Sequence, residues 1–349
     1  MSIETPKISV IIPLYNAEKY IKITLMSLKN QTFKDFEIVI VDDCSTDESL
    51  KIVKEFKETE EIGEKIRIIE LEKNGGISNT RNVGLRFSKG EYITFLDNDD
   101  LLIPAALEKF LNFAEEFQAE VIHTHSHYQN AKDAVHGDIM QFRMASFEHG
   151  NKKNLMKPAY PLTNDMSERM YQFSIYGIDW NVWGKFFRRD FLMINGIQFP
   201  KIALTEDMLF VFQTLLYAKK YIMIPDPLYV YRYRNDSTLH KDRDEGFLRK
   251  VIRVEIEGTK LLNSFMDELD HFKDNKHFKD RECGINFYLS LEHLATKLMQ
   301  KKFVDREDYF ELINEIYTEH FGKDATFIAF IHKLANQQQP DTKPPWPTN

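Results

Sequence analysis

Apolar runs alternate with stretches of helical periodicity along the first third of the chain. Between the runs, apolar side chains recur every three or four residues, as at Ile21, Leu25 and Leu28, which predicts amphipathic helices. Four runs rich in β-branched and aromatic residues predict buried strands, at residues 8–12, 37–41, 67–71 and 91–96. Strand–helix repeats of this length predict right-handed crossovers and a mostly parallel sheet flanked by helices, which is a Rossmann-like α/β fold.

Polar residues at the ends of these segments predict where helices begin. Asn16 would cap the helix that follows the first strand. Ser45 and Glu48 have the spacing of a capping box for the next helix.

Three of the four predicted strands end in polar residues: Tyr15–Asn16, Asp42–Asp43 and Asp97–Asp100. Ligands of such sheets bind outside the carboxyl ends of the strands. Carboxylates gathered there repel one another, and a divalent cation such as Mg²⁺ or Mn²⁺ relieves the repulsion and can neutralise a leaving diphosphate. The alternative is a solvated turn and helix cap, but the position after a buried strand favours a nucleotide and metal site.

Composition narrows the class of protein. The chain has 349 residues and a net charge of −8, which argues against a general nucleic-acid binder. Its two cysteines, Cys44 and Cys283, cannot build a disulfide framework or a zinc ribbon. The start of the chain lacks the pattern of a signal peptide, and no apolar stretch reaches 18 residues, so we expect a cytoplasmic protein, with contact at the inner face of the membrane left open.

The motifs of this chain resemble those of the family 2 glycosyltransferases, which are inverting enzymes of the GT-A fold. Each motif alone is weakly specific, but five follow in family order over about residues 7–105, and the resemblance resumes further on. The segments that carry it are residues 8–16, 31–33, 41–47, 74–82, 90–100, 183–185 and 205–207. The chain departs from the pattern at Cys44, where the family usually has Gly or Asn, and we expect the loop to tolerate the change.

The resemblance implies roles in binding a UDP-sugar donor. Pro13 and Tyr15 match the loop that holds the uracil base, with the Tyr ring stacking on it, and Asp43 matches the acidic residue that contacts the base. Arg81 matches the basic residue that helps to hold the nucleotide. The Asp-x-Asp motif matches Asp97, near the ribose, and Asp99, which would bind Mg²⁺ or Mn²⁺ at the diphosphate.

A second group of acids lies at a predicted helix N-terminus, where Thr205-Glu206-Asp207 precedes apolar residues at helical spacing. On its own the pattern is typical of a helix cap. The resemblance implies instead that Asp207 is the general base of the transfer, with Glu206 as a contact to the acceptor or to the fold. An inverting transfer needs one such base on the acceptor side.

Other residues of the middle third are candidates for the site. Trp183 has a ring suited to stacking on a sugar, with core packing as the alternative. Arg234 and His240 could reach the diphosphate from a loop, or could belong to a solvated basic strand. Three alternating histidines, His123, His125 and His127, would face one way on a single strand; a polar sheet face is the leading interpretation and a metal site the alternative.

Beyond the middle third the chain predicts helices. We expect a GT-A domain at 1–240, with a donor half at about 1–105 and an acceptor half at about 106–240, a helical region at 241–336 and a disordered tail at 337–349. One helix begins with Phe247, Val251 and Val254. An amphipathic segment near Phe330 would pack on its own domain, with a membrane surface or a second copy in a homodimer as alternative partners.

The sequence therefore predicts an inverting glycosyltransferase that moves a sugar from a UDP-sugar to a hydroxyl of a polysaccharide, a lipid-linked sugar or a peptide. A nucleotidyltransferase would need a Gly-rich basic loop after the first strand, where Pro13–Asn16 stands. A dehydrogenase would need Gly-x-Gly-x-x-Gly there, which is absent. A non-catalytic GT-A scaffold is the remaining alternative, disfavoured by the presence of Asp99 and Asp207.

Overall fold

The computed structural model describes residues 5–124, 126–130, 142–146, 158–174, 180–202, 204–232 and 245–274. The chain divides into two compact units, residues 1–241 and residues 242–349.

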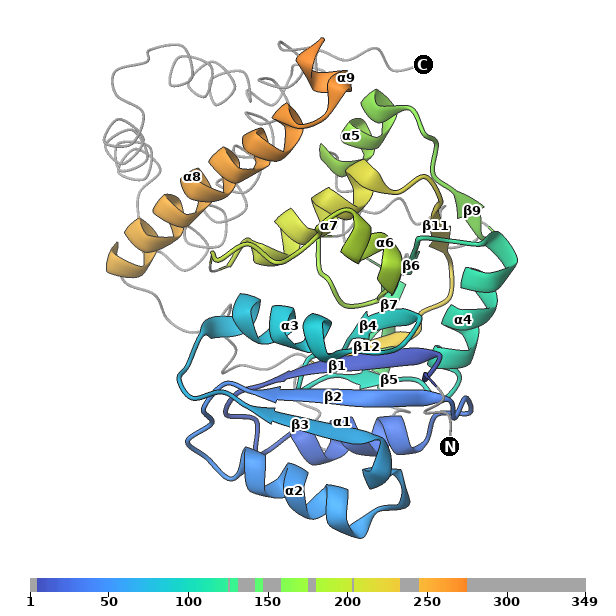
Figure 1. Ribbon diagram of the computed structural model, residues 1–349, viewed down its shortest axis with the longest axis vertical. Coiled ribbons are helices and arrows are strands. Elements are labelled where there is room, and N and C mark those ends of the chain that lie inside the picture. The colour runs from blue at the N-terminus through green and yellow to red at the C-terminus, as the bar shows by residue number, and fades with distance from the viewer. Residues whose placement is uncertain are drawn as a thin grey trace. The chain divides into compact units, whose positions relative to one another are not determined.

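The first unit contains an eight-stranded sheet and a four-stranded sheet (Figure 1). The strands are β1 (Ile8–Leu14), β2 (Phe36–Asp42), β3 (Ile66–Glu70), β4 (Tyr92–Phe95), β5 (Leu101–Leu102), β6 (Val121–Thr124), β7 (Ser126–Asn130), β8 (Phe142–Ser146), β9 (Tyr160–Pro161), β10 (Lys185–Arg188), β11 (Tyr221–Ile224) and β12 (Tyr229–Tyr231). The helices are α1 (Ile21–Lys29), α2 (Ser49–Thr59), a 3-10 turn at Glu61–Lys65, α3 (Gly76–Phe87), α4 (Ala106–Phe117), α5 (Met166–Ser174), α6 (Arg189–Ile194) and α7 (Glu206–Tyr217).

The large sheet has the order β3-β2-β1-β4-β10-β6-β11-β9. Its first four strands are parallel, as the strand–helix alternation predicts. β10 runs antiparallel to both β4 and β6, and β9 runs antiparallel to β11. The small sheet has the order β5-β12-β7-β8. The predicted α/β fold with a mostly parallel sheet flanked by helices is confirmed.

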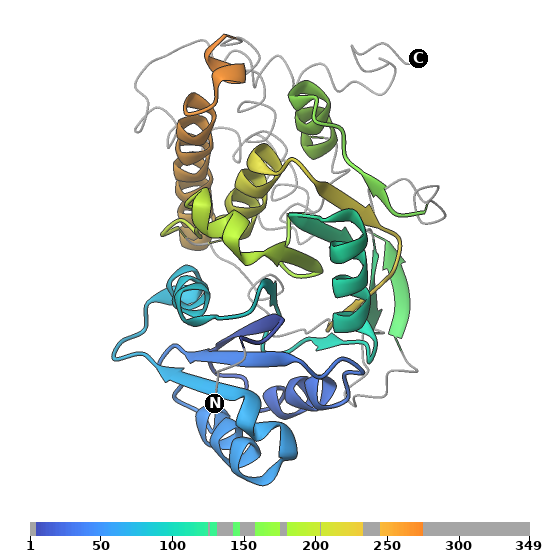
Figure 2. The ribbon, with the colours of Figure 1, turned by 45° about the vertical axis from the view of Figure 1, so that its right-hand side comes forward.

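β1 is the central strand of the donor half, and all seven of its residues are buried. Its pairing with β4 ends at Ile11, so Pro13 lies beyond that ladder and the strand continues to Leu14. α1 and α2 cover one face of this part of the sheet and α3 covers the other (Figures 1 and 2). Gly84 lets α3 approach closely, since a Cβ there would lie 2.3 Å from Cγ2 of Ile11.

The two predicted caps are wrong. α1 begins at Ile21, and Asn16 has a φ of 46° and accepts a hydrogen bond from Thr46 N. α2 begins at Ser49, with Glu48 at its N-cap and no side-chain cap. Asn16 and Ser45 bind across the two loops, and the residue that accepts from the first N–H of α2 is Asp47, through Ser49 N at 3.0 Å.

The histidine segment does not form a single strand. His123 lies in β6 of the large sheet, where it is buried with Nδ1 2.9 Å from the Tyr221 hydroxyl. His127 lies in β7 of the small sheet, and His125 lies outside the described residues. The expectation of one strand carrying all three histidines is therefore wrong.

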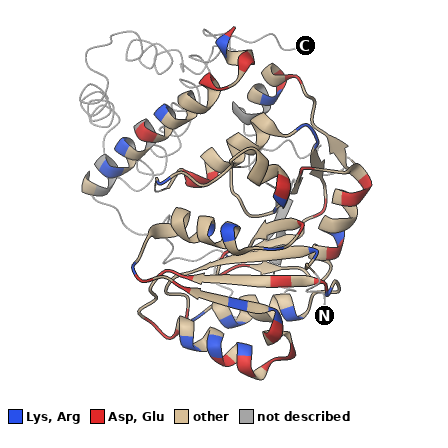
Figure 3. Ribbon diagram, in the orientation of Figure 1, with Lys and Arg blue, Asp and Glu red and all other residues tan. Residues whose placement is uncertain are grey.

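The second unit contributes two described helices, α8 (Glu245–Asp267) and α9 (Asp270–Lys273). α8 includes the predicted helix at Phe247–Val254. Basic and acidic residues are interspersed along it (Figure 3). Among the described residues, no helix is both long enough and apolar enough to cross a membrane. The segment near Phe330 and the predicted tail lie outside the described residues.

Candidate active site

The strand ends predicted to bind a ligand meet at one edge of the sheet, but their five carboxylates do not form one cluster. β1 lies between β2 and β4. Neighbouring strands are about 4.8 Å apart, so the ends of β2 and β4 are separated by about 10 Å. Asp42 is buried and accepts a hydrogen bond from Ser45 N at 3.2 Å. Asp100 is also buried, so neither of these two acids is directed at a shared ligand.

Tyr15 follows β1 in an exposed position, with 47% of its surface accessible. The preceding Pro13 carbonyl accepts a hydrogen bond from Asn98 Nδ2 at 2.9 Å, which joins this loop to the end of β4. A ring that is exposed next to an anchored backbone can stack on a base.

The loop of Tyr15 is held by the loop that follows β2. Asn16 N donates to Ser45 Oγ at 3.2 Å, and Ala17 N donates to Ser49 Oγ at 2.6 Å. Glu18 N donates to Asp47 Oδ2 at 3.0 Å. These backbone contacts fix the direction in which Tyr15 leaves the sheet.

Cys44 lies in the same pair of loops and has a φ of 61°. This left-handed conformation is adopted readily by Gly and Asn and costs other residues about 1 kcal/mol or more. The requirement explains why the family pattern has Gly or Asn at this position. The loop forms with Cys44, whose Sγ lies 3.0 Å from the Leu71 carbonyl oxygen.

Asp43 is buried and binds the glycine loop before α3. Its Oδ1 accepts from Gly75 N at 2.7 Å, and its Oδ2 accepts from Gly76 N at 2.9 Å. Gly76 has a φ of 79°, which favours glycine. In this structure, the carboxylate therefore anchors the loop that the resemblance places beside the nucleotide.

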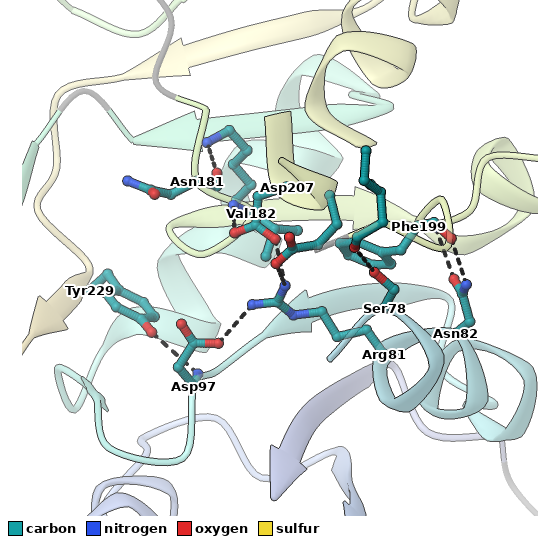
Figure 4. A network of polar contacts seen from close by, with 12 residues as sticks. Ser78, Arg81, Asn82, Asp97, Asn181, Val182, Phe199, Asp207 and Tyr229 are labelled. Atoms are coloured by element: carbon teal, nitrogen blue, oxygen red, sulfur yellow. Dashed lines mark hydrogen bonds and ion pairs between the residues drawn. The ribbon is translucent and has the colours of Figure 1, made fainter. Parts of the chain in front are cut away.

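Arg81 is the centre of the cluster that joins the two predicted groups of acids (Figure 4). It projects from α3, and only 1% of its surface is exposed. Nη2 donates to Asp97 Oδ1 at 3.0 Å, and Nη1 donates to Asp207 Oδ1 at 2.5 Å. Nη1 also lies 3.4 Å from Glu206 Oε1. The cluster gathers residues that are far apart in the sequence, since 126 positions separate Arg81 from Asp207.

Glu206 and Asp207 are the acids of the Arg81 cluster with raised pKa values. Burial and the neighbouring Asp207 carboxylate raise the pKa of Glu206 to about 7, against the lowering effect of Arg81. Burial also raises the pKa of Asp207, and Asp97 adds to this while Arg81 opposes it. Burial alone would lower the pKa of Arg81, but the three carboxylates raise it, so the guanidinium stays charged. Glu206 Oε2 is buried with no hydrogen-bond partner among the described residues.

Asp97 and Asp99 offer carboxylate oxygens on the loop after β4. Both are only partly buried. Within the described residues, no group of three or more His, Cys, Asp or Glu side chains could hold a metal ion. Mg²⁺ bound with a phosphorylated substrate takes only one or two carboxylates and completes its shell with phosphate and water oxygens. This donor set fits such an ion.

Tyr229 and Asp100 form a buried connection that the sequence pattern did not reveal. Tyr229 Oη donates to Asp100 Oδ2 at 2.8 Å and accepts from Asp97 N at 3.3 Å. Arg232 N donates to Asp100 Oδ1 at 2.7 Å. β12 thereby fixes the loop after β4. The sequence pattern of this segment draws attention to its basic residues, whereas a tyrosine in an apolar strand gives no signal of such a role.

Three further residues were predicted to contact the acceptor or the diphosphate: Trp183, Arg234 and His240. Trp183 is buried and stacks on Tyr229 and Tyr231, with ring centroids 4.7 and 5.7 Å away. It therefore packs in the core and does not offer an open face to a sugar, contrary to the expected acceptor contact. Arg234 and His240 lie outside the described residues.

The family model for glycosyl transferase family 2 matches residues 9–176. The segment includes the strand ends, the glycine loop and Arg81. Residues 9–176 therefore form a family 2 glycosyltransferase domain. The expectation of a family 2 glycosyltransferase with the GT-A fold is confirmed.

Relatives extend the match beyond that segment. The chain is 27% identical to EpsH of Bacillus subtilis over 278 residues, which are 77% of this chain and 74% of EpsH. It is 29% identical over 297 residues to the poly(ribitol-phosphate) beta-N-acetylglucosaminyltransferase TarS of Staphylococcus aureus. That match spans 82% of this chain but only 47% of TarS.

Solved structures are similar in fold. Residues 1–349 of S. aureus TarS in complex with UDP superpose with a TM-score of 0.63 and 23% identity, over 95% of this chain and 92% of that chain. The mannosyltransferase PcManGT from Pyrobaculum calidifontis, in complex with GDP-Man and Mn²⁺, has a TM-score of 0.51 and 17% identity, over 98% and 89%.

Proposed function

We propose that this family 2 glycosyltransferase transfers a sugar from a UDP-sugar to an acceptor hydroxyl with inversion at the anomeric carbon. The observation that carries the proposal is the Arg81 cluster. It brings Asp97, at the end of β4, together with Asp207, at the start of α7. A donor-side carboxylate and a candidate base on the acceptor side are thus joined in one site.

The donor would bind at the ends of β1, β2 and β4. Tyr15 would stack on the base beside Pro13, with Asp43 holding the glycine loop against the nucleotide. Asp97 would contact the ribose. The structure of TarS with UDP supports a uridine nucleotide as the donor carrier, although the likeness to this chain is one of fold.

Asp207 would act as the general base. Its carboxylate accepts the proton of the acceptor hydroxyl while that oxygen forms a bond to the anomeric carbon. The bond from the same carbon to the diphosphate oxygen breaks, and the nucleoside diphosphate leaves with the electron pair. Attack in line with the leaving group inverts the configuration.

Asp99 would hold Mg²⁺ or Mn²⁺. When bound, the ion supplies positive charge that neutralises the diphosphate. The mannosyltransferase of similar fold contains Mn²⁺, which supports a metal of this kind.

Residues 1–105 would then form the donor half and 106–240 the acceptor half of one domain. A polysaccharide, a lipid-linked sugar or a peptide would each supply the hydroxyl that the base requires.

The first test is calorimetric titration of UDP, with and without Mn²⁺, followed by a panel of UDP-sugars. We expect UDP to bind and chelation to weaken the binding. Binding of GDP or dTDP in place of UDP would overturn the donor assignment, and a chain that binds no nucleotide would be a non-catalytic scaffold.

A further inference from the structure

The environment of Arg81 differs from that of an arginine that binds a diphosphate. Its side chain is fully buried, and both terminal nitrogens are directed at carboxylates (Figure 4). The guanidinium also lies over the Phe199 ring, with Cζ 5.2 Å from the ring centroid. The cation is thus held inside the protein.

We propose that Arg81 is a positioning residue of the transfer reaction, which fixes the Asp207 carboxylate as the base and ties it to Asp97 on the donor side. The proposal rests on the function proposed above, because it assigns Arg81 a part in that reaction.

The orientation of Asp207 is fixed from two directions. Oδ1 accepts from Arg81, and Oδ2 accepts from Val182 N at 3.2 Å. A carboxylate with one partner on each oxygen cannot rotate freely about its last bond. One lone pair of each oxygen is used in this way, and the others remain for the proton of an acceptor hydroxyl.

α3 also holds the backbone that leads into Asp207. Ser78, Arg81 and Asn82 are spaced by three and four residues and so lie on one face of α3. Ser78 Oγ donates to the Ile202 carbonyl oxygen at 3.1 Å. Asn82 exchanges two hydrogen bonds with the backbone of Phe199, at 2.8 and 2.9 Å. The helix that carries Arg81 therefore anchors the segment before α7, and Arg81 completes the contact at the base itself.

Among the charged groups around Asp207, Arg81 is the main source of positive potential. Asp97 and Glu206 face it as acids, from the loop after β4 and from α7. Lys185 on β10 also lowers the pKa of Asp207, but less than Arg81 does. Without the guanidinium, Asp207 would become ionised only at higher pH.

The test compares Arg81→Gln and Arg81→Lys with Arg169→Gln and Arg169→Lys. Arg169 is a matched control, because it is equally buried but bonds to backbone carbonyls and to Asn164. In Arg81→Gln we expect kcat to fall by about 10²-fold, the cost of a slightly misplaced group. The acidic limb of the kcat profile should move up by about one pH unit or more. Arg81→Lys should restore part of kcat and reverse part of the pH shift. The Arg169 variants should leave the acidic limb of the kcat profile unchanged.

A titration that does not depend on activity separates this proposal from the proposed function. Aspartate labelled with ¹³C at its carboxyl carbon is followed by infrared difference spectroscopy, with the Asp207 band assigned by Asp207→Asn. The background is Glu206→Gln, which removes the coupled acid. We expect the pKa of Asp207 to rise in Arg81→Gln even if no sugar transfer is found.

Two results would overturn the proposal. In one, the pH limb and the Asp207 titration are the same with and without Arg81. In the other, Arg81→Gln raises KM for the donor and leaves kcat unchanged, as expected for an arginine that binds diphosphate. If Arg81→Gln does not fold, Arg81→Gln with Glu206→Gln removes one charge of each sign and gives the same comparison against Glu206→Gln alone.

Discussion

Asp43 and Asp100, at the sheet edge, and the three acids around Arg81 are satisfied in opposite ways. Asp43 accepts two backbone N–H groups, and Asp100 accepts one N–H and the Tyr229 hydroxyl, so each of their oxygens has its own donor. Asp97, Glu206 and Asp207 share one guanidinium. One buried oxygen of Glu206 has no partner among the described residues.

This difference separates acids that hold the fold from acids that can move a proton. An acid with a separate donor for each oxygen fixes loops and strands. Glu206 and Asp207, which compete for one cation, have raised pKa values, and that of Glu206 is about 7, where protons exchange near neutral pH. Burial raises the pKa of Asp100 as well, but both oxygens of Asp100 are held by donors of the fold. The Arg81 cluster is therefore the part of the site where substitution should change chemistry more than structure.

The largest effect is expected from Asp207→Asn. The amide keeps the shape of the side chain but cannot take a proton, so kcat should fall by about 10²–10⁴-fold. UDP affinity in calorimetry should stay close to that of the wild type, because the base acts on the acceptor. Near wild-type turnover would remove Asp207 from the role of base.

The next effect concerns stability and Glu206. Its pKa rises from 4.5 to about 7 on folding, so the folded state binds the proton more tightly than the unfolded chain. The stability that this proton contributes is present below pH 4.5 and is lost as pH rises to about 7. Relative to Glu206→Gln, the wild-type free energy of unfolding should fall by up to about 3 kcal/mol over this range.

Urea unfolding at several pH values measures this difference. Exposed Glu58→Gln is the control and should change the free energy of unfolding by less than about 0.5 kcal/mol at each pH. A difference between wild type and Glu206→Gln that stays constant with pH would show that Glu206 does not hold a proton in the folded state.

A smaller effect is expected from Asp99→Ala. Loss of a metal ligand should weaken the Mn²⁺-dependent part of UDP binding by about 10-fold or more. Mutation of even an outer-shell partner lowers metal affinity or activity by about 10–100-fold. Exposed Asp35→Ala, just before β2 and so at the opposite end of that strand, serves as the control. An unchanged response of UDP affinity to Mn²⁺ would exclude Asp99 from the metal site.

The smallest effect is expected from Tyr229→Phe. The variant removes one donor from Asp100, and a typical intramolecular hydrogen bond contributes about 0.5–1.5 kcal/mol to stability. The free energy of unfolding should fall by about that amount, while the acidic limb of kcat stays in place. A moved limb with unchanged stability would instead make Tyr229 part of the proton-transfer chemistry.

Local pattern was sufficient for the first half of the fold. Strands β1 to β4 and helices α1 to α4 follow from apolar periodicity, because the buried face of each is encoded within a few consecutive residues. The sequence did not predict β5 or the 3-10 turn at Glu61–Lys65. The resemblance of short motifs likewise indicated the family. Helix starts at Asn16 and Ser45 were mispredicted, because their side chains bind a neighbouring loop that only the folded sheet brings close.

The sequence by itself determined the class of fold and which residue types could carry the chemistry. Only the tertiary structure decided how those residues combine. It split the acids of β2 and β4 by placing β1 between them, buried Trp183, and enclosed Arg81 among three carboxylates. The physical reason is that the orientation and the pKa of a charged side chain depend on its neighbours in space. For Arg81 and Asp207, those neighbours are 126 positions apart along the chain.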